Sequence, residues 1–117
     1  MGQEMESLAR YYLENKNLIF LTQNWSCRHG EIDLIMLDTN NILAFIEVRY
    51  RNNNLWGSPT ESINAQKQKK IILTAQHFLQ KNSLTHADKV CRFDIVAISN
   101  NQNELNVDWI KQAFDAT

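Results

Sequence analysis

The spacing of apolar residues predicts two amphipathic helices in the chain. Across residues 3–14, apolar side chains recur every three or four positions, which places them on one face of a helix. The same spacing runs through a longer segment in the middle of the chain, which ends near Lys81. This second helix has two candidate starts. One is Ser58 as a cap, with Glu61 in the capping-box position, and the other is Asn64.

Short or alternating apolar segments predict the strands of one sheet. Residues 18–21 are apolar and are followed by a polar turn, while 31–37 and 42–51 are typical of strands that pair through a short polar connection. Residues 90–98 alternate without a breaker and predict another strand, and 107–114 fits a last short strand or a helix. This order of elements predicts an α/β fold with a central mixed β-sheet flanked by helices.

Length and composition place the chain among ordinary folded proteins. With 117 residues it has room for a single domain, 1–117, and 44% apolar residues with three Gly and one Pro exclude disordered or collagen-like classes. The longest apolar stretch, Ile42–Ile46, is far shorter than the roughly 20 residues of a membrane span. Cys27 and Cys91 are too few and too far apart for a disulfide framework or a zinc motif. We therefore expect a cytoplasmic protein with no membrane partner.

Charge is distributed unevenly along the sequence. The net charge is −1, but residues 49–92 hold eight basic and two acidic side chains, a formal charge of +6, which leaves −7 on the remainder. A local excess of positive charge can attract a polyanion even when the whole protein is slightly acidic. A lysine-rich, solvated helix face explains the same composition equally well. Charge alone therefore leaves both interpretations open.

Two carboxylates stand out among the predicted strands. Because side chains alternate along a strand, Glu47, Arg49 and Arg51 share a face, and hairpin pairing would bring Asp33 close to Glu47. Two unit charges about 5 Å apart repel by about 3 kcal/mol at an effective dielectric constant of about 20. A Mg²⁺ or Mn²⁺ ion, with the carbonyl of Val48 as a further ligand, would offset this repulsion. A simple ion pair with one of the arginines would also do so.

Three segments of the sequence, together with the opening helix, resemble a known family. The segments are Gly30–Ile35, Phe45–Arg51 and Arg92–Val96. In this order, and with Lys67 near the start of the long helix, they resemble the YraN family of uncharacterised bacterial proteins. That family is similar to the PD-(D/E)xK nucleases, whose fold is restriction-endonuclease-like, and in particular to Holliday-junction resolvases.

The resemblance implies roles for individual residues. Asp33 and Glu47 would bind the metal, Glu6 would add a nearby acidic group, and Lys67 would face the phosphate. Arg49 stands where the family pattern has lysine. A guanidinium stays protonated above pH 12, so Arg49 can orient groups and neutralise charge but cannot act as a base. The resemblance therefore leaves open whether this chain is an active enzyme.

Two functional hypotheses follow from the resemblance. The first is a Mg²⁺- or Mn²⁺-dependent endonuclease that cleaves branched or flapped DNA, with RNA as a second candidate substrate. The second is a noncatalytic nucleic-acid-binding or scaffolding module, in which Arg49 neutralises the carboxylates in place of a metal ion. Symmetric cutting of two strands would favour a homodimer. Four basic residues are candidates for outer contacts to the nucleic-acid backbone: Arg51, Lys69, Lys70 and Arg92.

Overall fold

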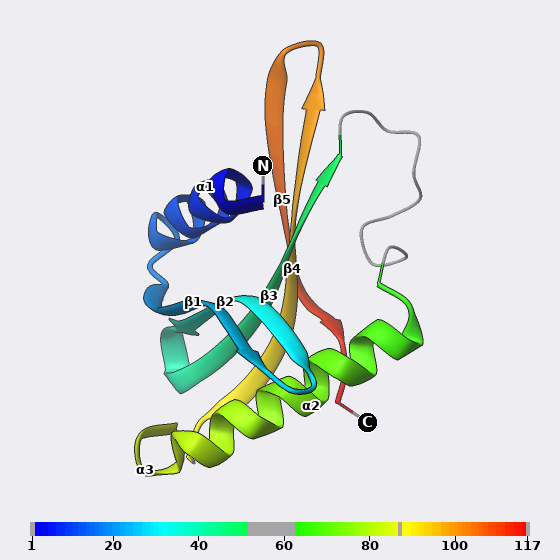
Figure 1. Cartoon of the computed structure of the whole chain (residues 1–117). Helices are drawn as coiled ribbons and strands as arrows, with labels where there is room; N and C mark the ends of the chain where they lie inside the picture. The colour runs from blue at the N-terminus through cyan, green and yellow to red at the C-terminus, as the bar shows by residue number, and fades with distance from the viewer. Residues whose placement is uncertain (1, 52–62, 87, 117) are drawn as a thin grey trace.

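The computed structural model describes residues 2–51, 63–86 and 88–116 (Figure 1). The described elements follow one another as helices, strands and a short 3-10 turn. In chain order they are α1 (Gly2–Glu14), β1 (Ile19–Cys27), β2 (Gly30–Asp38), η1 (Thr39–Asn41), β3 (Ile42–Arg51), α2 (Ala65–Lys81), α3 (Ser83–His86), β4 (Val90–Asn101) and β5 (Glu104–Phe114).

The five strands form one mixed sheet in the order β1-β2-β3-β4-β5. Strands β1, β2 and β3 pair antiparallel, β3 and β4 pair parallel, and β5 returns antiparallel to β4. A parallel pair needs a crossover connection, and the chain between β3 and β4 contains α2. The predicted α/β fold with a mixed sheet flanked by helices is confirmed, and it is compatible with a restriction-endonuclease-like core. None of the helices in the described part of the chain is long and apolar enough to cross a membrane.

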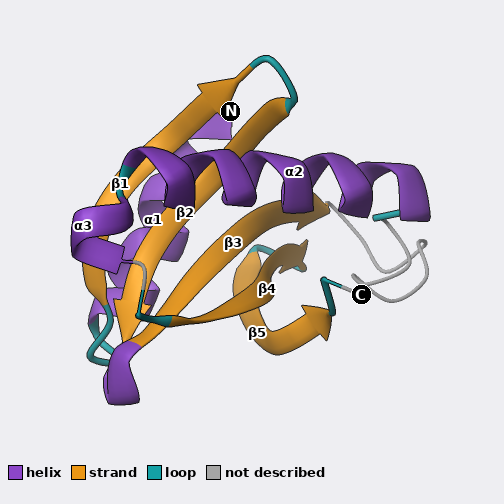
Figure 2. Cartoon of the chain, turned by 90° about the horizontal axis from the view of Figure 1, so that it is seen from below, coloured by secondary structure: helices purple, strands orange, loops and turns teal. Residues whose placement is uncertain are grey.

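Helices α1 and α2 lie on opposite faces of the sheet (Figure 2), and each face has its own apolar core. On the α2 side, Phe45 packs edge-on against Phe78 and stacks on Phe93, with ring centroids 6.0 Å and 5.6 Å apart. On the α1 side, Leu13 and Ile46 are fully buried. Strand β3 lies between β2 and β4, and its residues contribute to both cores. Polar groups on β3 are therefore held between well-packed layers.

The structure corrects the prediction of a polar turn directly after residues 18–21. Strand β1 continues beyond Leu21 to Cys27 and pairs with β2. Strand β1 is at the edge of the sheet, so its polar side chains can reach solvent while its backbone pairs on one side only. Residues 107–114, for which the sequence allowed either a short strand or a helix, belong to strand β5.

The start of α2 distinguishes the two predicted caps. The helix begins at Ala65, and the side-chain oxygen of Asn64 accepts a hydrogen bond from the backbone N–H of Lys67 at 2.8 Å. This is the N-cap arrangement expected for Asn. The alternative start at Ser58, with Glu61, lies outside the described residues. The cap fixes the first turn of α2, which carries Lys67.

Candidate metal and phosphate site

The backbone ladder between β2 and β3 gives way to side-chain hydrogen bonds at two acidic residues. The ladder reaches Leu34 and Ile46, and the next residues along the two strands are Asp33 and Glu47. Oδ2 of Asp33 accepts a hydrogen bond from the N–H of Val48 at 2.8 Å, and Oε2 of Glu47 accepts one from the N–H of Asp33 at 3.4 Å. Each carboxylate thus bonds to the opposite strand. We call Asp33 and Glu47 the acid pair.

A twist in β2 explains why Asp33 points toward β3. Residues two apart in a regular strand share a face, yet Ile32 packs into the α2-side core and Leu34 into the α1-side core. Asp33 lies between them, where the strand changes its inward face. The facing position on β1 is Asn24, whose φ of 54° is left-handed, a conformation that Asn tolerates better than most residues. The distortion in both strands turns the Asp33 side chain toward the neighbouring strand.

Burial of the acid pair makes its negative charge unfavourable. Glu47 is only 4% exposed, and burial, followed by the proximity of Asp33, raises the pKa of its carboxyl to about 8. Burial also raises the pKa of Asp33, although the hydrogen bond from Val48 and the charges of Lys67 and Arg49 oppose this shift. At neutral pH the pair therefore keeps a proton unless a cation takes its place.

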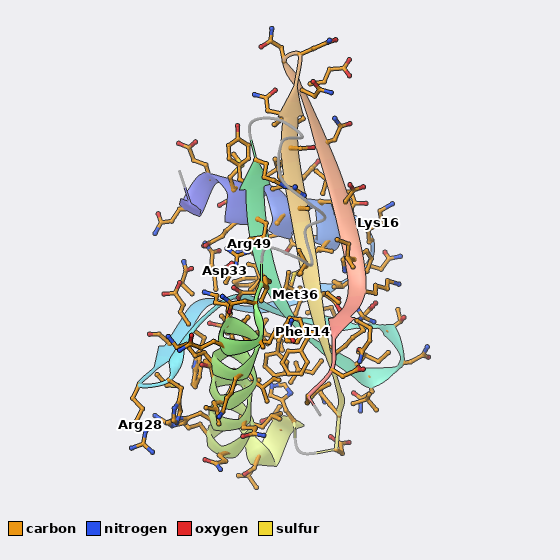
Figure 3. All side chains as sticks on the ribbon, turned by 90° about the vertical axis from the view of Figure 1, so that its right-hand side faces the viewer. Lys16, Arg28, Asp33, Met36, Arg49 and Phe114 are labelled. Atoms are coloured by element: carbon orange, nitrogen blue, oxygen red, sulfur yellow. The ribbon has the colours of Figure 1, made fainter. Side chains whose placement is uncertain are left out.

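Two basic side chains approach the acid pair without fully compensating it. Nζ of Lys67, on the first turn of α2, is 4.0 Å from Oε1 of Glu47. Arg49 lies next to Asp33, beyond the amino-terminal end of α2 (Figure 3). Nε of Arg49 is buried and has no hydrogen-bond partner within the described parts of the chain. A buried guanidinium N–H without an acceptor is a donor available to an anionic ligand.

Helix α1 brings a further acid to the Asp33 side of the site. Oε1 of Glu6 accepts a hydrogen bond from Nε2 of Gln23 at 3.4 Å. Burial and the nearby charge of Asp33 raise the pKa of Glu6, while Asn24 and Gln23 lower it by hydrogen bonding. The structure thus brings together the four residues to which the resemblance gave roles, Glu6, Asp33, Glu47 and Lys67, and places Arg49 beside them. The polar partners Gln23 and Asn24 were missed because they fall where a turn was expected.

The oxygen ligands available here fit a hard divalent cation. Within the described residues, no three His, Cys, Asp or Glu side chains converge as a complete metal site. Mg²⁺, however, typically binds one or two carboxylates and keeps several waters. The N–H and the carbonyl of a strand residue point to the same side, so the carbonyl of Val48 points toward the side where its N–H meets Asp33. Asp33, Glu47 and this carbonyl together form a suitable ligand set for Mg²⁺ or Mn²⁺.

Comparison with known proteins places the chain in a family. The model of the uncharacterised protein family UPF0102 matches residues 5–98. The chain belongs to the UPF0102 family. A UPF0102 protein of Ectopseudomonas mendocina (strain ymp) is 47% identical over 116 residues, which cover 99% of this chain and 95% of the relative. A relative from Pseudomonas fluorescens (strain Pf0-1) is 45% identical and covers 98% of this chain and 92% of its own length. The resemblance to the YraN family, which is UPF0102, is confirmed.

The outer basic residues of this UPF0102 protein lie at different distances from the acid pair. Lys70 follows Lys67 by one turn, and its side-chain stem lies beside Gly30 at the tip of the β1–β2 hairpin. Lys69 is exposed on the other flank of α2, near Asp115 of the carboxy-terminal segment. Arg51 is the last residue of β3, two positions beyond Arg49.

Arg92 forms part of an internal ion-pair network. Its Nη2 donates to Asp38 at 2.8 Å, and its Nε donates to Asp94, which is fully buried, at 2.8 Å. Asp94 also accepts hydrogen bonds from Nε1 of Trp109 and the N–H of Gln112. Sequence reasoning missed this role, although an Asp between the apolar residues of a buried strand is a signal of an internal partner. Because its guanidinium binds two internal carboxylates, we do not propose Arg92 as a contact to phosphate.

Proposed function

We propose that this UPF0102 protein binds structured DNA and hydrolyses phosphodiester bonds with the help of a divalent cation. The observation that supports this most is the acid pair, in which the buried carboxylate of Glu47 and the partly buried carboxylate of Asp33 converge at a break in the β2–β3 ladder. Asp33, Glu47 and the Val48 carbonyl would hold the ion. When bound, Mg²⁺ or Mn²⁺ supplies Lewis-acid polarisation of the phosphate and acidification of a water molecule.

The chain's own residues would position the phosphate. Arg49 offers a buried N–H without a partner in the described structure, and a guanidinium binds phosphate oxygens well. Lys67 lies on the exposed side of Glu47 and would contribute a second positive charge. Neither residue is proposed as the base, because Arg49 stays protonated and Lys67 faces a carboxylate. Both act by orienting the phosphate and by stabilising negative charge that develops during the reaction.

A cleavage assay tests this proposal directly. Purified protein would be incubated with Mg²⁺ or Mn²⁺ and single-stranded, duplex, flapped and four-way-junction DNA, and with RNA. We expect metal-dependent cleavage of at least one branched DNA, which Asp33→Asn and Glu47→Gln abolish. Glu31→Gln is the matched control, because Glu31 is an exposed residue on the same strand as Asp33. Cleavage that survives in both acid-pair variants would overturn the assignment.

The replacement of the family's lysine by Arg49 provides a second test. A lysine can lose its proton in a buried site and help to activate water, whereas arginine cannot. Arg49→Lys should therefore raise the cleavage rate if proton transfer limits the reaction. Equal or lower cleavage rates in Arg49→Lys would show that proton transfer by the residue at this position does not limit the reaction.

A noncatalytic binding module is a second candidate, favoured by the positive charges already near the acid pair. Arg49 and Lys67 oppose the rise in the pKa of both carboxyls, so they replace part of a metal ion's effect. Calorimetric titration with Mn²⁺ separates the two functions. If the protein is a metal-dependent enzyme, it should bind Mn²⁺ stoichiometrically, and Asp33→Asn should remove this binding. If it is a noncatalytic binding module, it should bind no Mn²⁺ at the acid pair. For either function, affinity for nucleic acid should fall steeply with added salt.

A further inference from the structure

One flank of α2 connects the acid pair with the opposite end of the helix. Lys67, Lys70, His77 and Lys81 follow a spacing that keeps them on one side, and α2 contains no Asp or Glu. This basic flank faces the β1–β2 hairpin, because the ring of His77 lies 5.9 Å from that of Trp25 on β1. Figure 3 shows α2 running away from Asp33 and Arg49 beside this hairpin. A strand of phosphates bound at the acid pair could continue along the basic flank.

A pocket of about 310 Å³ opens where the basic flank ends. It lies between β1 and the carboxy-terminal end of α2, and its walls combine aromatic and aliphatic surface with three polar side chains. The lining residues are Leu21, Thr22, Trp25, Phe78, Asn82 and His86. This volume is at the small end of the range for ligand sites, which suits a single heteroaromatic ring with its attached sugar. We call it the β1–α2 pocket.

His86 lines the β1–α2 pocket and carries an unused hydrogen-bonding atom. The residue is 9% exposed, and its Nδ1 is buried with no hydrogen-bond partner within the described residues. Its ring stacks on Phe78, with centroids 5.8 Å apart. Burial, with the nearby charge of Lys89, lowers the pKa of His86, so the ring is neutral at pH 7 and can recognise an uncharged polar edge. Buried polar atoms are normally paired, so an unpaired one on a residue that lines a pocket supports ligand binding there.

We propose that the β1–α2 pocket receives an unpaired base of a nucleic-acid strand whose phosphates follow the basic flank of α2. Phe78 is eleven residues after Lys67, a separation of about 16 Å along a helix. That distance corresponds to roughly five stacked nucleotides at about 3.4 Å each, and to fewer in an extended strand. The proposal rests on the proposed function and makes it more specific. The substrate then carries a single-stranded segment near the cleaved bond, as a flap or an open branch does.

Two single-stranded oligonucleotides of equal charge test this proposal. One is an oligothymidine, and the other is its abasic analogue, which has the same length and phosphates but no bases. Both would be titrated into the full-length protein at one salt concentration. We expect the base-bearing strand to bind at least about fivefold more tightly, because stacking of one base on aromatic side chains has about this effect. A 2-aminopurine placed in the strand should also lose fluorescence when it enters the pocket.

A matched pair of variants locates the effect in the pocket. Thr22→Met fills the β1–α2 pocket, and Ser26→Met makes a similar change at an exposed position on the same strand. We expect Thr22→Met to remove the preference for bases and Ser26→Met to keep it. A preference that persists in folded Thr22→Met would overturn the proposal. The comparison in the unmodified protein decides the question even if Thr22→Met fails to fold.

The outcomes also separate this inference from the proposed function. Equal binding of both strands overturns the pocket's role but leaves phosphate binding and metal-dependent cleavage intact. Binding of neither strand refutes the basic flank as a nucleic-acid surface, and the pocket proposal with it. Tighter binding of the base-bearing strand without any cleavage supports the pocket and the second candidate function, a noncatalytic binding module.

Discussion

Replacing Glu47 with Gln should stabilise the metal-free protein at alkaline pH. The substitution keeps the size of the side chain but removes its charge from the acid pair. In the folded protein the carboxyl of Glu47 has a pKa of about 8, compared with the ordinary value of 4.5. Because this folded-state pKa is raised, the native state holds a proton that the unfolded chain releases between these pH values. The stability of the unmodified protein must therefore fall as the pH rises through this window.

The size of the effect follows from the pKa difference. At about 1.4 kcal/mol per pKa unit, the shift corresponds to about 5 kcal/mol when the carboxyl is fully ionised. Glu47→Gln has no such titration. We expect the variant and the unmodified protein to have similar stability near pH 4.5, and the variant to be more stable by up to about 5 kcal/mol at pH 9. Urea denaturation in the presence of a chelator, repeated from pH 5 to pH 9, measures the difference.

Two controls make this prediction refutable. Glu31→Gln removes an exposed carboxylate from neighbouring β2 and should leave the pH dependence unchanged. Adding Mg²⁺ at pH 9 should restore stability to the unmodified protein but not to Glu47→Gln, because a ligand that binds only the native state stabilises it. If the free energy of unfolding has the same pH dependence in Glu47→Gln and in the unmodified protein, ionisation of buried Glu47 does not destabilise the fold, and the reasoning is refuted.

Three further changes test the structure outside the acid pair. Asp94→Asn should lower the free energy of unfolding in urea by about 3–5 kcal/mol, because it removes the buried charge of Asp94 and leaves the partly buried Arg92 with one of its two carboxylates lost. A change below about 1 kcal/mol would mean that the network contributes little. Asn64→Ala should lower the free energy of unfolding by about 1 kcal/mol through loss of the α2 cap, whereas Asn64→Asp should be neutral. Lys70→Gln should weaken DNA binding uniformly across sequences and reduce the salt slope by roughly one, as filter binding at several salt concentrations can show.

The acid pair could be predicted from sequence because both of its members lie on adjacent strands of a hairpin. The pairing of 31–37 with 42–51 is local, and alternation along β3 places Glu47 and Arg49 together. The hydrogen bonds that replace the ladder could not be predicted. They depend on the twist at Asp33, which arises from packing of its two neighbours into different cores and from the left-handed backbone of Asn24.

Long-range polar networks were beyond the reach of sequence patterns. Arg92 looked like a phosphate contact because it is basic and follows a basic region of the chain. Its partners are Asp38 on β2 and Asp94 on its own strand, and the first of these contacts depends on the order of strands in the sheet. The strand identity of residues 22–26 was missed for a related reason. Polar composition favours a turn locally, but pairing with β2 outweighs that preference.

Among the described strands, the one parallel pair, β3 with β4, has a consequence for how the molecule folds. Strands β1, β2 and β3 follow one another directly, so their contacts need only short loops to close. Strand β4 is separated from β3 in the sequence by the segment that contains α2. Contacts between such distant segments form more slowly than local ones. The two carboxylates thus belong to the early, local part of folding, and Lys67 arrives with the later crossover. We expect the β1–β2–β3 segment to bring Asp33 and Glu47 together before Lys67 of α2 reaches Glu47.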